Sequence, residues 1–310
     1  MSKLIIGVDG GGTKSHLALF DAAGNCAGVS VCGPLNHECL EGSFGELESV
    51  LGNFILGALR AANAEVSDVN HALFGIAGVD TKVQHQIISD MLRRIGLSKF
   101  TLCNDAFLGV AAGCPDGNGI CAINGTGSAM AGVDGSGDSI QVGGIGELSN
   151  DCGGSGWYVT QALGAVYGAL FKRERPTVLR EMMFDLIGVT REEDYVEALT
   201  GAINSDSLDR KALNRLAFIA ASEGDPAARD ILETSAAHYA GGIAYLADKL
   251  DFPKDRTLYV ALAGSVFIRE KVKILPRLIE QRVKEALRGR TVAFVNLETV
   301  PVAGAVLWAS

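Results

Sequence analysis

Residues 4–21 read Leu-Ile-Ile-Gly-Val-Asp-Gly-Gly-Gly-Thr-Lys-Ser-His-Leu-Ala-Leu-Phe-Asp, an apolar run that passes through three glycines into a second apolar run. Residues 120–134 read Ile-Cys-Ala-Ile-Asn-Gly-Thr-Gly-Ser-Ala-Met-Ala-Gly-Val-Asp and repeat this design. Two such glycine turns can face each other across a cleft, with their backbone N–H groups directed at a phosphate chain. The repeated segment therefore predicts a nucleotide site between two related halves of the chain.

The residues that follow each turn exclude two familiar phosphate-binding motifs. A Walker A loop and a dinucleotide fingerprint both lead into a helix. Residues 14–21 instead alternate between two faces with a period of two, which is typical of a strand. Each glycine turn is therefore predicted to lie in a β-hairpin.

Length and composition indicate a two-domain α/β enzyme. The chain has 310 residues, of which 48% are hydrophobic and 39 are glycine. Its net charge of −9, without a basic run, makes nucleic acid and anionic membranes poor partners. Seven cysteines without paired spacing indicate reduced thiols, and there is no signal peptide or membrane-span pattern, so we expect a soluble, cytoplasmic protein.

The two halves show the same order of predicted elements. In the first half this order is three strands, helix, strand, helix, strand and a short helical segment. The strands are predicted at 3–9, 14–21, 26–32, 71–76 and 99–103, and the helices at 43–62, 82–95 and 106–113.

The second half restarts this order and adds a helical insertion at about 153–250. The other predicted elements are strands at 119–124, 128–133, 139–143, 257–263 and 291–296, a helix at 265–287 and a last helix after Pro301. Repetition on this scale indicates duplicated domains, which we place at 1–115 and 116–310. The last helix is expected to pack on the first domain.

Five short motifs then give the chain a family resemblance. They are Asp9-Gly10-Gly11-Gly12-Thr13-Lys14, Asn104-Asp105-Ala106, Asn124-Gly125-Thr126-Gly127-Ser128, Ala263-Gly264-Ser265 and Pro301-Val302-Ala303-Gly304-Ala305. In this order they resemble the sugar kinase, Hsp70 and actin ATPase superfamily, and within it the BadF/BadG/BcrA/BcrD group that includes N-acetylglucosamine and glucosamine kinases. The resemblance covers essentially the whole chain. It implies an α/β fold of two RNase H-like domains with a nucleotide cleft between them.

The resemblance also implies which residues bind ATP. The expected phosphate and adenosine contacts are Gly10, Gly11, Gly12, Thr13, Lys14, Gly125, Thr126, Gly127, Ser128, Gly264 and Ser265. Asp9 ends an apolar strand and either caps the turn or holds a hydrated Mg²⁺, which keeps several waters and few protein ligands. Lys14 either reaches the γ-phosphate or is solvated at the start of its strand.

Asp105 is the expected general base, again by resemblance. It follows the predicted strand at 99–103, and open α/β sheets bind ligands beyond the carboxyl ends of their strands. An aspartate with the ordinary pKa of about 3.9 is a weak base toward an alcohol. It can still orient the acceptor hydroxyl and accept its proton late in a loose transition state.

The expected sugar site contains two departures from the family pattern. The predicted contacts are Asn36, Gly78, Asp105, Thr126, Ile145, Gly146 and Asp151. Ile145 stands where the family commonly has Trp, and Cys152 stands where it has Glu. Losing an aromatic face and a carboxylate changes the pocket, and this leaves the identity of the sugar open.

These observations together predict an ATP- and Mg²⁺-dependent kinase that phosphorylates the 6-hydroxyl of N-acetylglucosamine or glucosamine. N-acetylmuramate or another hexose is the alternative substrate, and a homodimer is expected because family members often dimerise. A BadF-type ATPase that shares an iron–sulfur cluster needs two cysteines after the second glycine turn, where only Cys152 remains. A DNA-binding regulator is disfavoured because the chain lacks the zinc-binding cysteine cluster of such relatives. A nucleotide sensor without turnover stays open because of Ile145 and Cys152.

Overall fold

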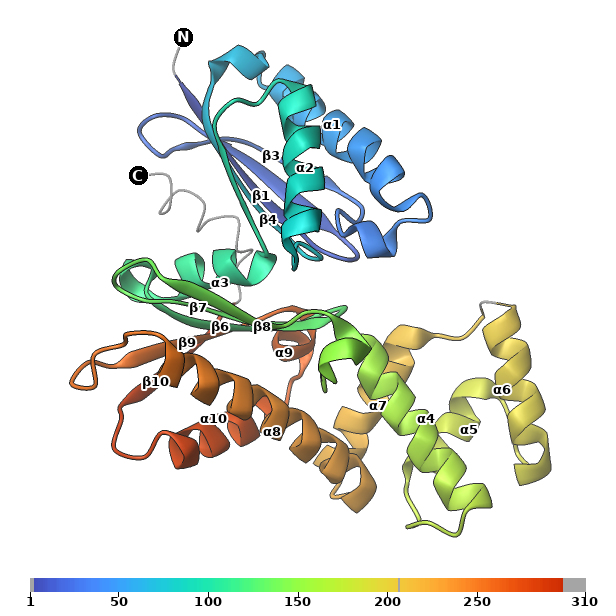
Figure 1. Cartoon of the computed structure of the whole chain (residues 1–310). Helices are drawn as coiled ribbons and strands as arrows, with labels where there is room; N and C mark the ends of the chain where they lie inside the picture. The colour runs from blue at the N-terminus through green and yellow to red at the C-terminus, as the bar shows by residue number, and fades with distance from the viewer. Residues whose placement is uncertain (1–2, 206, 298–310) are drawn as a thin grey trace.

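The computed structural model describes residues 3–205 and 207–297, and its first half is built on one five-stranded mixed sheet (Figure 1). The strand order is β3-β2-β1-β4-β5, with β1 antiparallel to β2 and parallel to β4. The strands are β1 (Leu4–Gly10), β2 (Ser15–Phe20), β3 (Cys26–Cys32), β4 (Val69–Ile76) and β5 (Phe100–Cys103).

The second half repeats this sheet. Its order, β8-β7-β6-β9-β10, matches the first when each strand is paired with its counterpart. The strands are β6 (Gly119–Asn124), β7 (Ser128–Val133), β8 (Ser139–Gly143), β9 (Leu258–Ala263) and β10 (Val292–Asn296). The predicted α/β duplication is confirmed. The antiparallel pair β1–β2 corresponds to β6–β7, and the parallel pairs β1–β4 and β4–β5 correspond to β6–β9 and β9–β10.

Two amphipathic helices, α1 (Ser43–Ala61) and α2 (Lys82–Ile95), pack on the first sheet (Figure 1). Their buried apolar side chains join those of β1, β2 and β4 in one core. The Thr81 side chain accepts a hydrogen bond from Gln84 N and so caps the start of α2. This cap fixes where the segment after β4 becomes a helix, and it therefore also fixes the position of Asp80, the residue just before the cap.

Helix α3 (Asp105–Gly113) lies between the two sheets (Figure 1). It contacts β4 on one side and β6, β7 and β9 on the other. On the first side Leu108 packs directly over Gly75, and on the second Gly109 packs against Cys121. The helix that follows the first sheet therefore joins both domains.

The predicted helical insertion is confirmed. It comprises α4 (Ser155–Phe171), α5 (Leu179–Ile187), α6 (Tyr195–Asn204), α7 (Arg210–Ser222) and α8 (Pro226–Lys249). Helices α8 and α10 (Ile274–Ala286) pack against each other, and their apolar faces share one core with the second sheet. Short 3₁₀ segments, η1 (His37–Cys39), η2 (Val66–Asp68), η3 (Pro115–Gly117), η4 (Gly146–Ser149) and η5 (Glu192–Asp194), lie in the connections.

The single helix predicted at 265–287 is wrong, because the chain forms α9 (Ser265–Arg269) and a separate α10. The buried Glu270 carboxylate accepts hydrogen bonds from Ile274 N and Leu275 N at the start of α10. Lys273 adopts a left-handed conformation (φ 57°) and its Nζ donates to Phe267 O at the end of α9. Two charged side chains thus satisfy the backbone groups that a continuous helix would have paired.

The expected helix after Pro301 lies outside the described residues. All seven cysteines are free thiols. Among the helices that the structure describes, none combines the length and the apolar character needed to cross a bilayer.

Candidate active site

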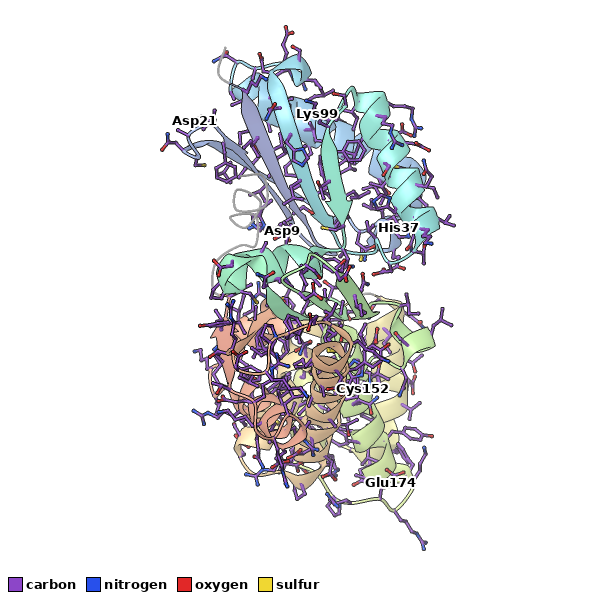
Figure 2. The ribbon with its side chains drawn as sticks, turned by 60° about the vertical axis from the view of Figure 1, so that its left-hand side comes forward. Asp9, Asp21, His37, Lys99, Cys152 and Glu174 are labelled. Carbon is purple, nitrogen blue, oxygen red and sulfur yellow. The ribbon has the colours of Figure 1, made fainter. Side chains whose placement is uncertain are left out.

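The two glycine turns meet where the domains face each other. Thr13 Oγ1 and Thr126 Oγ1 are 3.1 Å apart and share a hydrogen bond, although 113 positions separate them. A Cβ added at Gly12 would lie 3.2 Å from the Thr126 side chain. Figure 2 shows Asp9 and His37 at the end of the first domain that faces the second. The two glycine turns therefore lie against each other at the boundary between the two halves of the chain.

Backbone hydrogen bonds hold the first loop in place. Gly10 O accepts from Ala77 N at 2.8 Å, and Gly11 O accepts from Leu35 N at 3.0 Å and from Asn36 N at 3.3 Å. These bonds join the loop to the ends of two other segments of the first domain. The expected phosphate ligand Lys14 is exposed at the start of β2.

The second loop rests on the buried Asn124. Its Oδ1 accepts from Gly154 N at 2.8 Å, and its Nδ2 donates to Tyr158 Oη at 2.9 Å. The expected adenosine residue Gly264 lies against the same asparagine, since a Cβ there would be 2.5 Å from Asn124 O. Gly264 also has φ 98°, a conformation that glycine adopts without strain.

The remaining expected ATP residues differ in exposure. Gly125 N donates to Gly127 O at 2.9 Å, which closes the tight turn, and Ser265 is exposed at the start of α9. Ser128 is 6% exposed, next to Gly153. Thr126 and Gly127 thus face outward from the second loop, while the Ser128 side chain is directed into the domain.

Asp105 is half-buried as the first residue of α3. Asn104, rather than Asp105, caps this helix, because Asn104 Oδ1 accepts from Ala106 N at 2.9 Å. Burial raises the pKa of Asp105 to about 8, and the negative charges of Asp9 and Asp80 add to the shift. The ordinary pKa assumed from sequence is therefore wrong, and the carboxylate is a stronger base than an exposed aspartate.

Asp9 is half-buried at the end of β1, opposite His16 in β2. Its Oδ2 lies 3.8 Å from His16 Nδ1. Within residues 3–205 and 207–297, no three His, Cys, Asp or Glu side chains are close enough to enclose a metal ion. A Mg²⁺ ion bound to nucleotide phosphates needs only one or two protein carboxylates, so the single Asp9 carboxylate suits a hydrated ion.

The Asp151 carboxylate organises the predicted sugar loop. Its Oδ2 accepts from Gly144 N at 2.9 Å and from Gly146 N at 3.0 Å. Its Oδ1 is buried, lies 3.8 Å from His238 Nε2 and has no hydrogen-bond partner in the part of the chain that the structure describes. Burial lowers the pKa of His238, against the charge of Asp151. The His238 side chain is half-buried on α8 beside this carboxylate.

Two other predicted sugar residues, Asn36 and Gly78, touch. Asn36 Oδ1 accepts from Glu38 N at 2.9 Å, and a Cβ at Gly78 would lie 2.4 Å from the same oxygen. Ile145 is 45% exposed beside Gly146, and Cys152 is half-buried, with its Sγ 3.4 Å from Asn150 O. The structure thus gathers Asp151, Gly146 and Ile145 in one loop, and it brings Asn36 and Gly78 together from two other loops.

Sequence reasoning missed Asp80. Its Oδ1 accepts from Asn104 Nδ2 at 2.9 Å and also from Gln141 Nε2 in the other domain. Burial raises the pKa of Asp80 to about 6, against the hydrogen bond from Gln141. A signal was available, because Asp80 follows the carboxyl end of β4 just as Asp105 follows that of β5.

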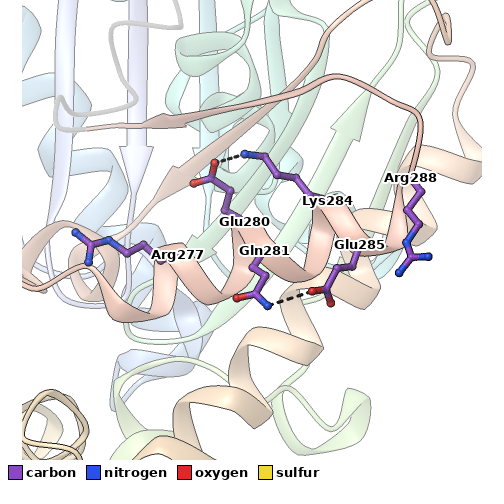
Figure 3. Close-up of a pocket in the computed structure, with 6 residues that line it drawn as sticks. All are labelled: Arg277, Glu280, Gln281, Lys284, Glu285 and Arg288. Carbon is purple, nitrogen blue, oxygen red and sulfur yellow. Dashed lines mark hydrogen bonds and ion pairs between the residues drawn. The ribbon is translucent and has the colours of Figure 1, made fainter.

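A separate depression lies on the outer surface of the second domain (Figure 3). All the side chains that line it come from α10 and the turn after it: Arg277, Glu280, Gln281, Lys284, Glu285 and Arg288. Glu280 pairs with Lys284, and Gln281 pairs with Glu285, each one helical turn apart. These are the solvated pairs of one helix face, remote from the two phosphate loops.

Comparison with known proteins relates the chain to a family and to two kinases. The sequence profile of the BadF/BadG/BcrA/BcrD ATPase family matches residues 6–309. The chain is 26% identical over 268 residues to the N-acetylmuramic acid/N-acetylglucosamine kinase of Clostridium acetobutylicum, covering 85% of this chain and 86% of that protein. It is 25% identical over 323 residues to the N-acetyl-D-glucosamine kinase of Dictyostelium discoideum, covering 100% and 98%.

Solved structures share the fold. A protein from Chromobacterium violaceum assigned as an N-acetylglucosamine kinase superposes with a TM-score of 0.70. That match covers 100% of this chain and 99% of the other at 20% identity. At this identity the likeness concerns the fold alone.

Proposed function

Because the chain belongs to the BadF/BadG/BcrA/BcrD ATPase family, we propose that it is an ATP-dependent amino-sugar kinase that phosphorylates the 6-hydroxyl of N-acetylglucosamine or glucosamine. The observation that carries this proposal is the meeting of the two phosphate loops at Thr13 and Thr126, with the half-buried Asp105 carboxylate at the same domain junction. The kinase names of the two relatives support the acceptor class.

The chemistry follows from the placement of these groups. Phosphoryl transfer needs the phosphate charge neutralised and the acceptor oxygen held in line, and it needs little covalent work from the protein. The backbone N–H groups of residues 10–13 and of Thr126 and Gly127 would bind the phosphate chain from the two domains. Asp105 would accept the proton of the sugar hydroxyl, and its raised pKa favours that transfer.

Mg²⁺ is the expected cofactor, and bound Mg²⁺ would neutralise charge on the β- and γ-phosphates. Asp9 would hold it through water, at the end of β1. The Asp9 carboxylate raises the pKa of Asp105 by its charge, which places these two groups within electrostatic reach of each other.

The sugar would lie against the loop that Asp151 organises. The unpartnered Asp151 Oδ1 is suited to accept a hydrogen bond from a sugar hydroxyl. Asn36, on the facing domain, would contribute an amide. Ile145 offers an aliphatic side chain where the family pattern has Trp, so we expect weaker contact with the sugar face than an aromatic ring would give.

The direct test is ADP release with Mg-ATP over N-acetylglucosamine, glucosamine, N-acetylmuramate, N-acetylmannosamine, glucose and no sugar. We expect turnover with N-acetylglucosamine or glucosamine well above the control without sugar. Turnover confined to N-acetylmuramate or glucose would name the alternative acceptor. Equal ADP release with every sugar and without sugar would contradict the proposed kinase activity and would favour an ATPase or a nucleotide sensor.

The assembly is expected to be a homodimer. Sedimentation equilibrium tests this, since a single species at the monomer mass would contradict it.

A further inference from the structure

Asp80 and Gln141 connect the two domains through one hydrogen bond between side chains. Gln141 Nε2, on β8 of the second domain, donates to Asp80 Oδ1, on the segment between β4 and α2 of the first. The two residues are 61 positions apart. Both are half-buried, so the bond is shielded from solvent more than a surface pair is.

On the first domain, Asp80 is hydrogen-bonded to the residue that precedes the expected general base, Asp105. Asp80 Oδ1 also accepts from Asn104 Nδ2 at 2.9 Å. Asn104 is 3% exposed, and its Oδ1 is occupied by Ala106 N, so its amide has only one orientation that satisfies both bonds. Asp80 therefore helps to fix the residue that precedes Asp105 and caps its helix.

On the second domain, Gln141 contacts the backbone of the expected sugar loop. Gln141 Nε2 also lies 3.3 Å from Gly143 O. A Cβ added at Gly144 would lie 2.8 Å from both Asp80 Oδ1 and Gln141 Nε2, so this backbone packs directly on the pair. Gly144 N in turn donates to Asp151 Oδ2. An unbroken series of contacts thus runs from Asp105 to Asp151 across the domain boundary.

We propose that Asp80 is a positioning residue, which holds the sugar loop of the second domain against the catalytic end of the first through Gln141. This inference rests on the proposed function, since the alignment it creates is that of a sugar hydroxyl toward Asp105. When the bond is made, Asp151 and Asp105 face one bound sugar in a fixed geometry. When it is broken, the phosphate loops still bind ATP, while the sugar loses half of its site.

The first variant to test is Gln141→Glu, which places a carboxylate against the Asp80 carboxylate. We expect KM for the sugar to rise at least about tenfold, because a hydrogen bond to a charged group is lost and a like-charge contact replaces it. KM for ATP should change less than about twofold, since Gln141 does not touch the phosphate loops. Equal increases in both KM values would overturn the proposal.

The rescue variant combines Asp80→Asn with Gln141→Glu. In this pair the side chain at position 80 is neutral, so the like-charge contact with the new carboxylate at 141 is removed, while Oδ1 still accepts from Asn104 Nδ2. We expect the sugar KM to fall at least about threefold from its value in Gln141→Glu toward that of the wild type, a recovery that a merely structural role would not produce. A double variant as impaired as the sum of the single variants would contradict the positioning role.

The matched control uses the Gln86–Asp90 pair on the exposed face of α2, in which Gln86 Nε2 donates to Asp90 Oδ1 at 3.0 Å. Gln86→Glu makes the same chemical change within one helix and should leave both KM values unchanged.

Amide hydrogen exchange keeps this inference separate from the proposed function. Gln141→Glu should speed exchange in residues 139–151 and 77–84, and the double variant should restore their protection, whether or not any sugar is phosphorylated. If the wild type turns over no sugar, the proposed function fails while exchange still shows whether the pair joins the domains. Unchanged exchange in Gln141→Glu would overturn the inference alone.

Discussion

At the scale of single residues, the proposed proton transfer depends on several carboxylates that interact through their charges where the two domains meet. Asp9 and Asp80 both raise the pKa of Asp105, in addition to its burial. Glu38 and Asp151 likewise oppose ionisation of Asp80. Several acidic groups thus face one region, and their charges make Asp105 and Asp80 better proton acceptors than these two would be in water.

Replacing Asp105 separates proton transfer from nucleotide binding. Asp105→Asn keeps the shape of the side chain but cannot accept the proton of the sugar hydroxyl. We therefore expect kcat to fall by roughly 10²-fold or more. Titration calorimetry with a non-hydrolysable ATP analogue should show a Kd within about threefold of the wild type. Retention of the wild-type kcat would show that Asp105 is not the base.

The same variant should change how stability depends on pH. The pKa of Asp105 rises from the ordinary 3.8 to about 8 on folding, so the folded state binds the proton more tightly than the unfolded chain. The stabilisation of the folded state by the proton on Asp105 is complete below pH 3.8, and it is lost as the pH rises through about 8. Asp105→Asn carries no such dependence, and it should gain stability relative to the wild type by at least about 1 kcal/mol between pH 5 and pH 9.

Chemical denaturation at these two pH values checks that expectation. Asp185→Asn, an exposed change on α5, serves as the control and should show no such gain. A difference between Asp105→Asn and the wild type that stays constant with pH would contradict the raised pKa.

At the scale of elements, α3 determines how closely the two sheets approach. A Cβ added at Gly109 would lie 2.3 Å from the buried Cys121 Sγ in β6, a distance that no packed structure tolerates. Leu108, on the opposite face, fills the space over Gly75 in β4. The helix can move toward neither sheet without displacing buried atoms.

Gly109→Ala should therefore destabilise the protein by about 1–3 kcal/mol, in spite of the better helix propensity of alanine. Gly164→Ala on α4 is the matched control, because a Cβ at Gly164 meets nothing within 4 Å. It should stabilise by about 0.5–1 kcal/mol. Urea denaturation of both variants gives the comparison, and equal effects of the same sign would refute the packing argument.

At the scale of the whole molecule, the proposed active site lies between the two halves of the chain. Thr13 and Thr126 come from equivalent hairpins of the two halves, and their hydroxyl groups meet in the described structure. Asp80 and Gln141 form a second link between the two halves, beside the loop that we propose binds the sugar. Closure of the domains would then assemble the nucleotide and sugar sites together and exclude water from the phosphates.

A double-mutant cycle on Thr13→Val and Thr126→Val tests the nucleotide side of this junction. Valine keeps the shape of threonine without its hydroxyl, and each single change removes the same interdomain hydrogen bond. We expect a coupling of about 0.5–1.5 kcal/mol in the Kd for an ATP analogue. Thr160→Val, an exposed position on α4, should be neutral, and strictly additive effects of the two loop variants would show that the hydroxyl groups act separately.

The amino-acid sequence by itself determined the elements and the chemical types at the site. The period of two after each glycine turn predicted the hairpins, and the repeated order of strands and helices predicted the duplicated sheets. Both are local patterns, so they can be read without knowing which residues meet. The motifs placed Asp9, Asp105 and the two glycine turns at strand ends, and in the structure the two turns are in contact at Thr13 and Thr126.

Only the tertiary structure decided what surrounds those residues. The hydrogen bond between Asp80 and Gln141, the approach of His238 to Asp151 and the raised pKa of Asp105 all depend on groups far apart along the chain. The break between α9 and α10 likewise required Glu270 to be buried at a helix start. Burial and charge proximity are properties of the packed domains, and no local pattern of residue types encodes the free energy of ionising a carboxylate inside them.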